Sequence, residues 1–475
     1  MNFLFALVLL ASCLATASAR GDGKMRRAVA NSHVGARLRV PQPGTLDVTD
    51  FVAKPNNATD NTAPSQAALD ACTKQGGGEV FVPTGHFVFK GGLTIPPGCT
   101  LSGTYTVVPS HDMRQDNKLN DGTVLIPTAG RNLPGGCDIN CTEAFIHISS
   151  NGNLRGLVIY YQEQETVQTP VPYPWAVFMQ GNNAALTDVE LLGAWNGVAA
   201  VAAHRHYIAR VQGQPLNIGV FVDETYDIGR LEDVHFNPWY SSATPFIWYQ
   251  TTHGRAFVLG RSDWEYVFNT FAFGYAIGYH FIERATGSMN GNFLGIGQDL
   301  AVNASVQVDQ SQPYGILITN GEFTSFCAPP FCPPHTTAPT SQVVVSAKNV
   351  GAVKFVNSAF WGRTTQIAQV NGFGTVTFSQ CHFDQWDNHL YGNGTKYQAG
   401  TAAIQQGGGT MIVSQSEFTC TTCGKTPHHF LLGPEAKKTI ISENIVRGPL
   451  SVENQGKGKV IVVNNADDAP VSDEL

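Results

Sequence analysis

The sequence predicts an all-β protein, a single-stranded parallel β-helix that carries a short N-terminal capping helix. Three observations predict this fold class: a short β unit recurs along the chain, glycine is abundant at 49 residues, and helical periodicity is confined to one short segment. Abundant glycine with recurring Val and Phe is typical of strands joined by tight corners. A solenoid of stacked coils also accommodates 475 residues without the size limit of a single core.

The recurring unit is an apolar β run, a polar corner residue, two variable residues, and then Phe or another apolar residue. It occurs at Ile318–Phe323, Phe355–Phe360, Phe378–Phe383, Val413–Phe418 and Ile441–Val446. The alternating apolar residues point inward, and the polar residue binds backbone groups at the corner. We therefore expect one continuous β-helix from about residue 45 to 464, with Phe323, Phe360, Phe383 and Phe418 in one internal stack.

The most diagnostic motif lies at the start of this region. A strand at Asp47–Lys54 is followed by Asp60-Asn61-Thr62-Ala63, a helical pattern over Ala63–Lys74, and a glycine-led strand pair over Gly77–Phe87. This order resembles the N-terminal signature of the pectate lyase superfamily, the pectin-lyase-like, polygalacturonase-related proteins. The resemblance implies a right-handed β-helix whose first coil is capped by the helix, so that strand edges are covered. It is detailed over residues 45–105, but Lys54–Asn57 stands where the family has a Gly-Asp-Gly loop.

The sequence divides the chain into four parts. Residues 1–19 are predicted to be a signal peptide, because Phe3–Leu10 is apolar and Ala17–Ala19 forms a small-residue cleavage site. Residues 20–44 are predicted to be a flexible segment, 45–464 the β-helix and 465–475 an acidic tail. We expect secretion, with the ER lumen as an alternative because the chain ends in Ser472-Asp473-Glu474-Leu475.

Cysteine usage fits the secretory pathway. Nine cysteines follow the signal peptide, and three pairs of them are close in sequence: Cys137/Cys141, Cys327/Cys332 and Cys420/Cys423. We expect short-range disulfides that staple loops, with at least one thiol left over because nine is odd. A zinc or redox site at Cys420-x-x-Cys423 with His428 and His429 is a weaker alternative. Glycosylation motifs occur at Asn57, Asn140, Asn303 and Asn393.

The resemblance supplies no catalytic residue. The family's Asn-Thr-Asp, Asp-Asp, Gly-His-Gly and Arg-Ile-Lys patterns for hydrolysis are not met as a set, and its lyase signatures are absent. Thr252-His253-Gly254 partly matches the Gly-His-Gly pattern, but the other patterns of the set do not accompany it. Candidate residues must therefore come from the chemistry of the chain itself.

Two polar clusters carry the chemistry that a sugar site needs. They lie about one to two coils apart and combine carboxylates, arginines and tryptophans, which supply acid and base groups, hydrogen-bond donors and a platform for a sugar ring. The predicted catalytic residues are Asp223, Asp227, Asp263 and Glu265, and the predicted substrate-binding residues are Arg230, His235, Trp239, Arg261 and Trp264. The alternative is that these charged groups only cap and pair at β-helix corners. We expect Asp223 or Asp227 to face Asp263 or Glu265 across a groove.

Other aromatic and polar residues are weaker candidates for the same groove. Tyr160, Tyr161, Tyr173, Trp175 and Trp195 fit core packing better than groove lining. His204 and His206 flank Arg205 and are expected to be exposed polar residues, with a metal site as the weaker alternative.

The sequence thus predicts a secreted protein that acts on a polysaccharide by glycosidic bond hydrolysis or β-elimination. The alternative is a non-catalytic glycan-binding protein of a cell wall or matrix. The net charge of −7 disfavours nucleic acid as a partner. No transmembrane segment and no metal site is predicted, the cofactor is unknown, and Ca²⁺ fits only the lyase alternative.

Overall fold

The computed structural model describes residues 44–106, 122–133, 136–165, 167–238, 241, 243–397, 400–420, 423 and 427–468. The predicted signal peptide, the N-terminal segment up to residue 43 and the last four residues lie outside these ranges. No helix in the described ranges is both long enough and apolar enough to span a membrane.

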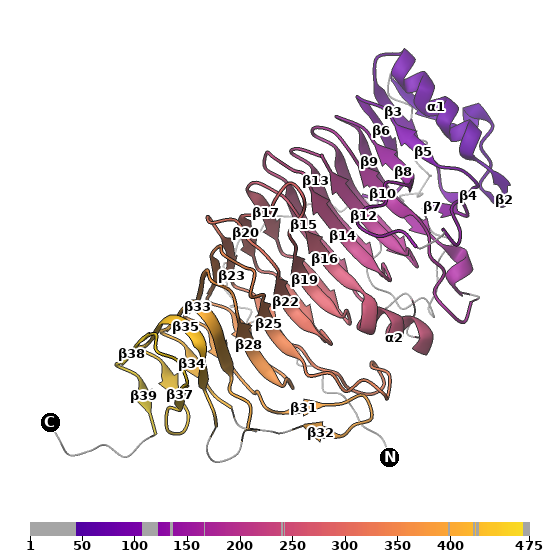
Figure 1. Cartoon of the computed structure of the whole chain (residues 1–475). Helices are drawn as coiled ribbons and strands as arrows, with labels where there is room; N and C mark the ends of the chain where they lie inside the picture. The colour runs from indigo at the N-terminus through magenta and orange to yellow at the C-terminus, as the bar shows by residue number, and fades with distance from the viewer. Residues whose placement is uncertain are drawn as a thin grey trace, which may run out of the picture. The chain divides into compact units, whose positions relative to one another are not determined.

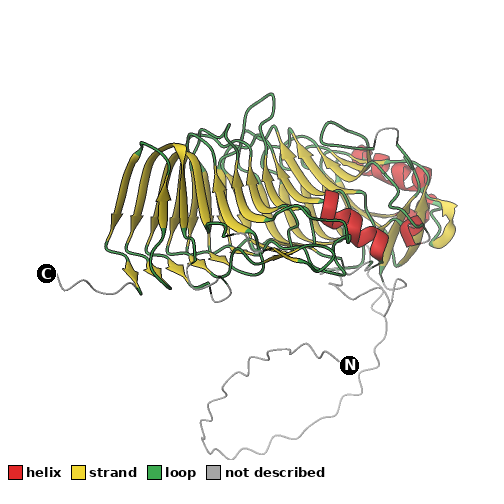
Figure 2. Cartoon of the chain, turned by 60° about the horizontal axis from the view of Figure 1, so that its bottom comes forward, coloured by secondary structure: helices red, strands yellow, loops and turns green. Residues whose placement is uncertain are grey.

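The described chain forms a parallel β-helix, so the predicted fold class is confirmed (Figure 1). Successive coils stack strand on strand, and each coil contributes to up to three ladders, which we call sheets A, B and C in chain order within a coil. Figure 2 shows the strands stacked in this way, with the helices gathered toward the N-terminal half. Strands run from Thr45 to Asp467, so the last strand ends within the segment predicted to be a tail.

Sheet A forms the first side of each coil. Its strands are β5 (Leu93–Ile95), β8 (Ala144–Ile148), β10 (Trp175–Met179), β12 (Asn196–Val201), β14 (Ile218–Asp223), β16 (Arg255–Leu259), β19 (Ile277–Phe281), β22 (Ala304–Val308), β25 (Ser341–Val345), β28 (Gln366–Val370), the first parts of β33 (Ile404–Ser414) and β35 (Phe430–Ser442), and β37 (Val452–Asn454).

Sheet B follows sheet A after a corner turn. Its strands are β1 (Thr45–Asp47), β3 (Gly78–Phe81), β6 (Cys99–Ser102), β9 (Asn153–Tyr160), β11 (Ala185–Leu192), β13 (Tyr207–Gly213), β15 (Arg230–Phe236), β17 (Glu265–Phe268), β20 (Gly291–Leu294), β23 (Ile316–Thr319), β26 (Val353–Val356), β29 (Thr375–Ser379), the later parts of β33 and β35, and β38 (Lys459–Val463).

Sheet C completes each coil with short strands. They are β2 (Asn56–Asp60), β4 (Gly85–Phe89), β7 (Thr123–Pro127), the ends of β9 to β15, β18 (Phe271–Phe273), β21 (Gly297–Asp299), β24 (Glu322–Phe323), β27 (Ala359–Phe360), β30 (His382–Phe383), β34 (Glu417–Phe418), β36 (Ile445–Val446) and β39 (Ala466–Asp467). A separate antiparallel pair joins β31 (His389–Leu390) to β32 (Lys396–Tyr397), and two 3-10 helices span Val48–Phe51 and Gln162–Glu165.

The predicted phenylalanine ladder is confirmed. Phe323, Phe360, Phe383 and Phe418 are register partners on successive sheet C strands, and all four are fully buried. Their neighbouring ring centroids lie 4.6–5.4 Å apart, within the range of favourable aromatic contacts. The polar residue of the unit adopts the left-handed conformation at the corner between sheets B and C, as at Asn320, where φ is 57°.

The predicted capping helix is α1 (Thr62–Lys74), which buries Ala68, Leu69 and Cys72 against the first coil. At the other end, β37, β38 and β39 each pair with a strand on one side only within the described residues. A second helix, α2 (Thr244–His253), was not predicted; Pro245 in its first turn suits a helix start, but its apolar residues follow no regular stripe.

Three disulfides match the predicted short-range pairs. Cys137–Cys141, Cys327–Cys332 and Cys420–Cys423 have Cα separations of 5.3, 5.7 and 5.5 Å. A fourth, Cys72–Cys99, joins α1 to β6 with a Cα separation of 6.2 Å and was missed because its cysteines are far apart in sequence. The leftover described thiol is Cys381, which is buried.

Candidate functional site

Four successive turns between sheets A and B form a groove of about 450 Å³, which we call the corner groove. The turns precede β15, β17, β20 and β23, so residues distant in sequence come together through the stacking of coils. The lining side chains are Tyr226, Asp227, Ile228, Arg261, Asp263, Trp264, Asn290, Gln312 and Tyr314. The groove therefore contains residues from both of the polar clusters that the sequence singled out.

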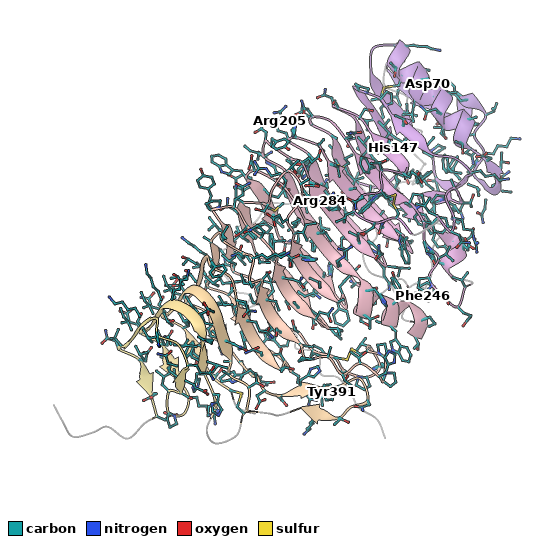
Figure 3. All side chains as sticks on the ribbon, viewed as in Figure 1. Asp70, His147, Arg205, Phe246, Arg284 and Tyr391 are labelled. Atoms are coloured by element: carbon teal, nitrogen blue, oxygen red, sulfur yellow. A yellow bond between two sulfur atoms is a disulfide. The ribbon has the colours of Figure 1, made fainter. Side chains whose placement is uncertain are left out.

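Two of the four predicted catalytic carboxylates, Asp227 and Asp263, line the corner groove. Asp227 forms an ion pair with Arg205, whose position near the edge of the stack is labelled in Figure 3. Asp263 accepts a hydrogen bond from Arg261 at 2.9 Å and another from the Gln312 amide at 2.7 Å. Both carboxylates are thus held by cations or amides, and their catalytic role stays a prediction.

Asp223 lies beneath the corner groove rather than in it. The residue is 2% exposed, and one carboxylate oxygen accepts the backbone N–H groups of Glu224 and Arg261. The other oxygen accepts a hydrogen bond from Arg284 at 2.7 Å. Its hydrogen bonds fasten the turn before β15 to the turn before β17, and its catalytic role stays a prediction.

Glu265 is also buried beneath the groove. Its side chain is fully inaccessible, and it contacts His206 at 3.0 Å and accepts the Ser262 hydroxyl at 2.7 Å. Burial lowers the pKa of His206, but the charge of Glu265 and its hydrogen bond outweigh burial and raise the pKa above the ordinary value. A side chain at Gly229 would collide with both groups, so glycine is required there.

Of the predicted substrate-binding residues, some line the groove and others lie elsewhere. Arg261 and Trp264 line the groove; the buried Arg261 Nε has no hydrogen-bond partner among the described atoms, and Trp264 is 59% exposed. Arg230 lies on the outer face of β15, in register with Tyr266. His235 lies further along β15, near Asn237 and edge-on to Phe271. Trp239 lies outside the described residues.

Exposed apolar side chains continue from the groove across the outer face of sheet B. Tyr266 and Phe268 on β17 and Leu294 on β20 are 41%, 49% and 42% exposed. Strand alternation turns these residues outward while Val267 and Phe293 fill the core. We call this surface the apolar face, and it leads from the corner groove to the opposite corner of the coils.

A second hollow of about 250 Å³ lies at that opposite corner, between sheets B and C, and we call it the Asp299 pocket. Its lining comprises Asn269, Thr270, Phe271, Gly295, Ile296, Gly297, Gln298, Asp299, Asn320, Glu322, Thr324 and Trp361. Burial raises the pKa of Asp299 to about 6, and the charge of Glu322 adds to this shift. The sequence did not predict this pocket, because its two carboxylates belong to different coils and have no charged cluster around them.

The structure also shows where the remaining aromatic and histidine candidates lie. Tyr160, Tyr161, Tyr173, Trp175 and Trp195 are all buried, as core packing required. His206 is fully buried against Glu265, so the expectation that it is exposed was wrong. His253 ends α2 and stacks on Tyr249, apart from the groove residues.

No group of three or more His, Cys, Asp and Glu side chains within the described ranges is arranged to hold a metal ion. The Ca²⁺ that a lyase mechanism would use has no matching ligand set among these residues.

Comparison with known proteins supports the fold. Residues 45–172 match the family model described as Rhamnogalacturonase A/epimerase, pectate lyase-like. DFA-IIIase from Arthrobacter chlorophenolicus, solved in complex with GF2, is similar over 85% of this chain and 94% of its own, with a TM-score of 0.50 and 13% identity. The fold is the pectin-lyase-like β-helix. The resemblance inferred from the N-terminal motif is thereby confirmed.

Two further similar proteins come from Azotobacter vinelandii. The A-module of its mannuronan C-5 epimerase AlgE6 is similar over 90% of this chain and all of that module, with a TM-score of 0.48 and 13% identity. Alginate lyase 7 is 48% identical over 63 residues, which are 13% of this chain. The chain spans only 7% of the length of that relative.

Proposed function

We propose that the protein is secreted and acts on a polysaccharide that lies across the apolar face, from the corner groove toward the Asp299 pocket. The observation that carries this proposal is the gathering of exposed rings and polar groups on one side of the coils. Trp264, Tyr266 and Phe268 offer flat apolar surfaces to sugar rings, and the groove adds carboxylates, amides and Arg261 for the hydroxyls.

The length of the surface favours a chain over a single sugar. Asn269 in the pocket lies five positions after Trp264 in the groove, and extended backbone spans about 3.3 Å per position, or roughly 16 Å in all. The named relatives support the substrate class, since they include a rhamnogalacturonase family and an alginate lyase. Bond cleavage by hydrolysis or β-elimination is the reaction that we propose.

A non-catalytic glycan-binding protein is the second candidate. The observation that favours it is the pairing of Asp227 with Arg205 and of Asp263 with Arg261. Such charge-assisted pairs bind sugar hydroxyls well without transferring a proton.

One experiment separates the two candidates. The secreted protein is tested for binding to a panel of acidic and neutral polysaccharides by affinity electrophoresis. The same mixtures are assayed for new reducing ends and, separately, for the ultraviolet absorbance of unsaturated products. Asp227→Asn, Asp263→Asn and Trp264→Ala should weaken binding, whereas Glu435→Gln, an exposed residue on β35 remote in the coil order, should not. Binding without either product favours the glycan-binding candidate; no binding to any polysaccharide would contradict the proposal.

A further inference from the structure

The Asp299 pocket contains two carboxylates whose positions follow from strand register. Gly297 on β21 pairs with Glu322 on β24, and Gln298 pairs with the buried Phe323. Asp299 and Glu322 therefore both alternate to the outer face, on neighbouring strands and two residues out of step. Both line the same hollow.

This register sets the separation of the two Cα atoms. Neighbouring strands lie about 4.8 Å apart and two residues advance by about 6.6 Å, which places the two Cα atoms at roughly 8 Å. Carboxyl groups at about 6.5–9.5 Å are typical of hydrolases that act with inversion, because a water molecule fits between the sugar and the base. The neighbouring strands thus present both carboxyl groups to the same hollow, where an acid and a base of this kind could act on one bound sugar.

The two carboxyl groups also differ in environment. Asp299 is the more buried, and burial together with the charge of Glu322 favours its protonated form. Glu322 is exposed and accepts a hydrogen bond from the Trp361 indole at 3.1 Å. Neither group is in an ion pair within the described part of the chain, in contrast to Asp227 and Asp263.

A buried donor that still lacks a partner points to a ligand in this pocket. Thr324 is 1% exposed, lines the hollow and has no hydrogen-bond partner for its hydroxyl among the described atoms. An unpaired hydroxyl in such a site costs stability unless a ligand or water completes it. Trp361, which is 42% exposed on the same wall, offers a platform for a sugar ring.

We infer that the Asp299 pocket is a hydrolytic site for neutral glycosides, in which Asp299 is the general acid and Glu322 the general base. The inference rests on the proposed action on polysaccharide and adds the cleavage site and the sugar class. The sugar is neutral because the lining contains two carboxyl groups and no Lys, Arg or His to balance a uronate. Glu322 is the charged lining group that faces Asp299.

The reaction balances with one water molecule. The Asp299 carboxyl gives its proton to the glycosidic oxygen as the bond from that oxygen to the anomeric carbon breaks. Glu322 takes a proton from the water whose oxygen forms the new bond to the same carbon. Glu322 then loses that proton to solvent and Asp299 regains one, so each cycle consumes water and yields two sugar ends.

The test uses the full secreted chain with neutral polysaccharides such as galactan, arabinan, xylan and β-glucan. Asp299→Asn and Glu322→Gln should each lower kcat by about 100-fold or more, with little change in binding measured by affinity electrophoresis. The matched control is Glu417→Gln, which occupies the same outward position as Glu322 on a later sheet C strand and should leave the rate unchanged. Thermal melts establish that each variant is folded.

Two further readouts identify the roles. The product released first should have the inverted anomeric configuration by NMR, and the basic limb of the kcat profile near pH 6 should vanish in Asp299→Asn. Near-normal rates in both variants, a product of retained configuration, or cleavage of uronate polymers alone would each overturn the inference. A wild-type protein that binds polysaccharide but cleaves no neutral glycan also overturns it, while the binding part of the proposed function stands.

Discussion

The corner groove and the Asp299 pocket lie at the two ends of the same sheet B strands, yet their carboxylates differ in ion pairing. In the groove, Asp227 and Asp263 each have an arginine partner, and beneath it Asp223 has Arg284. In the pocket, Asp299 has no ion-pair partner among the described residues and its pKa is raised to about 6. Dense clusters of opposite charge in a sequence therefore tend to neutralise one another, whereas a proton donor arises where a carboxyl group is isolated.

The largest expected effect is a loss of stability when the buried pair of Glu265 and His206 beneath the groove is broken. Glu265→Gln leaves His206 buried without its carboxylate, and breaking a buried pair costs about 3–5 kcal/mol of unfolding free energy. Chemical denaturation measures the loss. The matched change in the pocket, Glu322→Gln, removes an exposed group and should cost much less. Equal losses for the two variants would contradict the contrast between a buried and an exposed carboxylate.

The same pair predicts a pH dependence of stability. Because the pKa of His206 is raised in the folded protein, its stabilising contribution is complete below the ordinary value of 6.5 and is lost as pH rises through the folded pKa. The wild type should lose this increment on the alkaline side, and Glu265→Gln should lack it. A flat wild-type profile over this range would show that the buried pair does not titrate.

Asp299 should give an effect of intermediate size. Its pKa is raised from 3.8 to about 6, so its contribution to stability is present below pH 3.8 and falls as pH rises toward 6. The shift corresponds to at most about 3 kcal/mol. Asp299→Asn should abolish this dependence in denaturation experiments at both ends of the window, whereas Asp263→Asn should not.

Removing an exposed aromatic ring from the groove should have a smaller effect, on polysaccharide affinity. Trp264→Ala removes an exposed platform from the corner groove and should weaken polysaccharide binding by about 0.5–1.5 kcal/mol, while Trp264→Phe retains a ring and most of the affinity. Isothermal titration with soluble oligosaccharides measures both. An alanine variant with unaltered affinity would remove the groove from the binding surface.

The smallest expected effect is at the edge of the groove. Arg205 and Asp227 are about half exposed, with 43% and 46% of their side chains accessible, and such pairs contribute at most about 1 kcal/mol. Arg205→Gln should therefore change the melting temperature little, even in low salt. A large loss would mean that the pair supports the turn as strongly as Asp223 does.

Much of the fold was predictable because it repeats. The phenylalanine of each unit occupies the same place in every coil, so Phe323 and Phe418 could be assigned to one ladder from spacing alone. Cys327 and Cys332 could be paired because few residues separate them. The Cys72–Cys99 disulfide depends on how α1 lies on the first coil, which local sequence does not specify.

The site was predictable only in part. Charge density located the corner groove, but the depth of each side chain depends on strand alternation: Glu265 points inward and Tyr266 outward although they are adjacent. No sequence pattern indicated that Asp299 and Glu322 lie in one pocket, because their proximity arises from the pairing of β21 with β24. Coil register, rather than composition, decides which carboxylates meet.

The single-sided pairing of β37, β38 and β39 has a mechanical consequence. Within the described residues, the last coil pairs with one neighbouring coil, whereas α1 covers the first. In a stack where each coil contacts only its neighbours, a pulling force on the C-terminus detaches one coil before loading the next. Extension of a single molecule should proceed in steps, each releasing the residues of one coil, and the rings of Phe418, Phe383 and Phe360 would separate in that order.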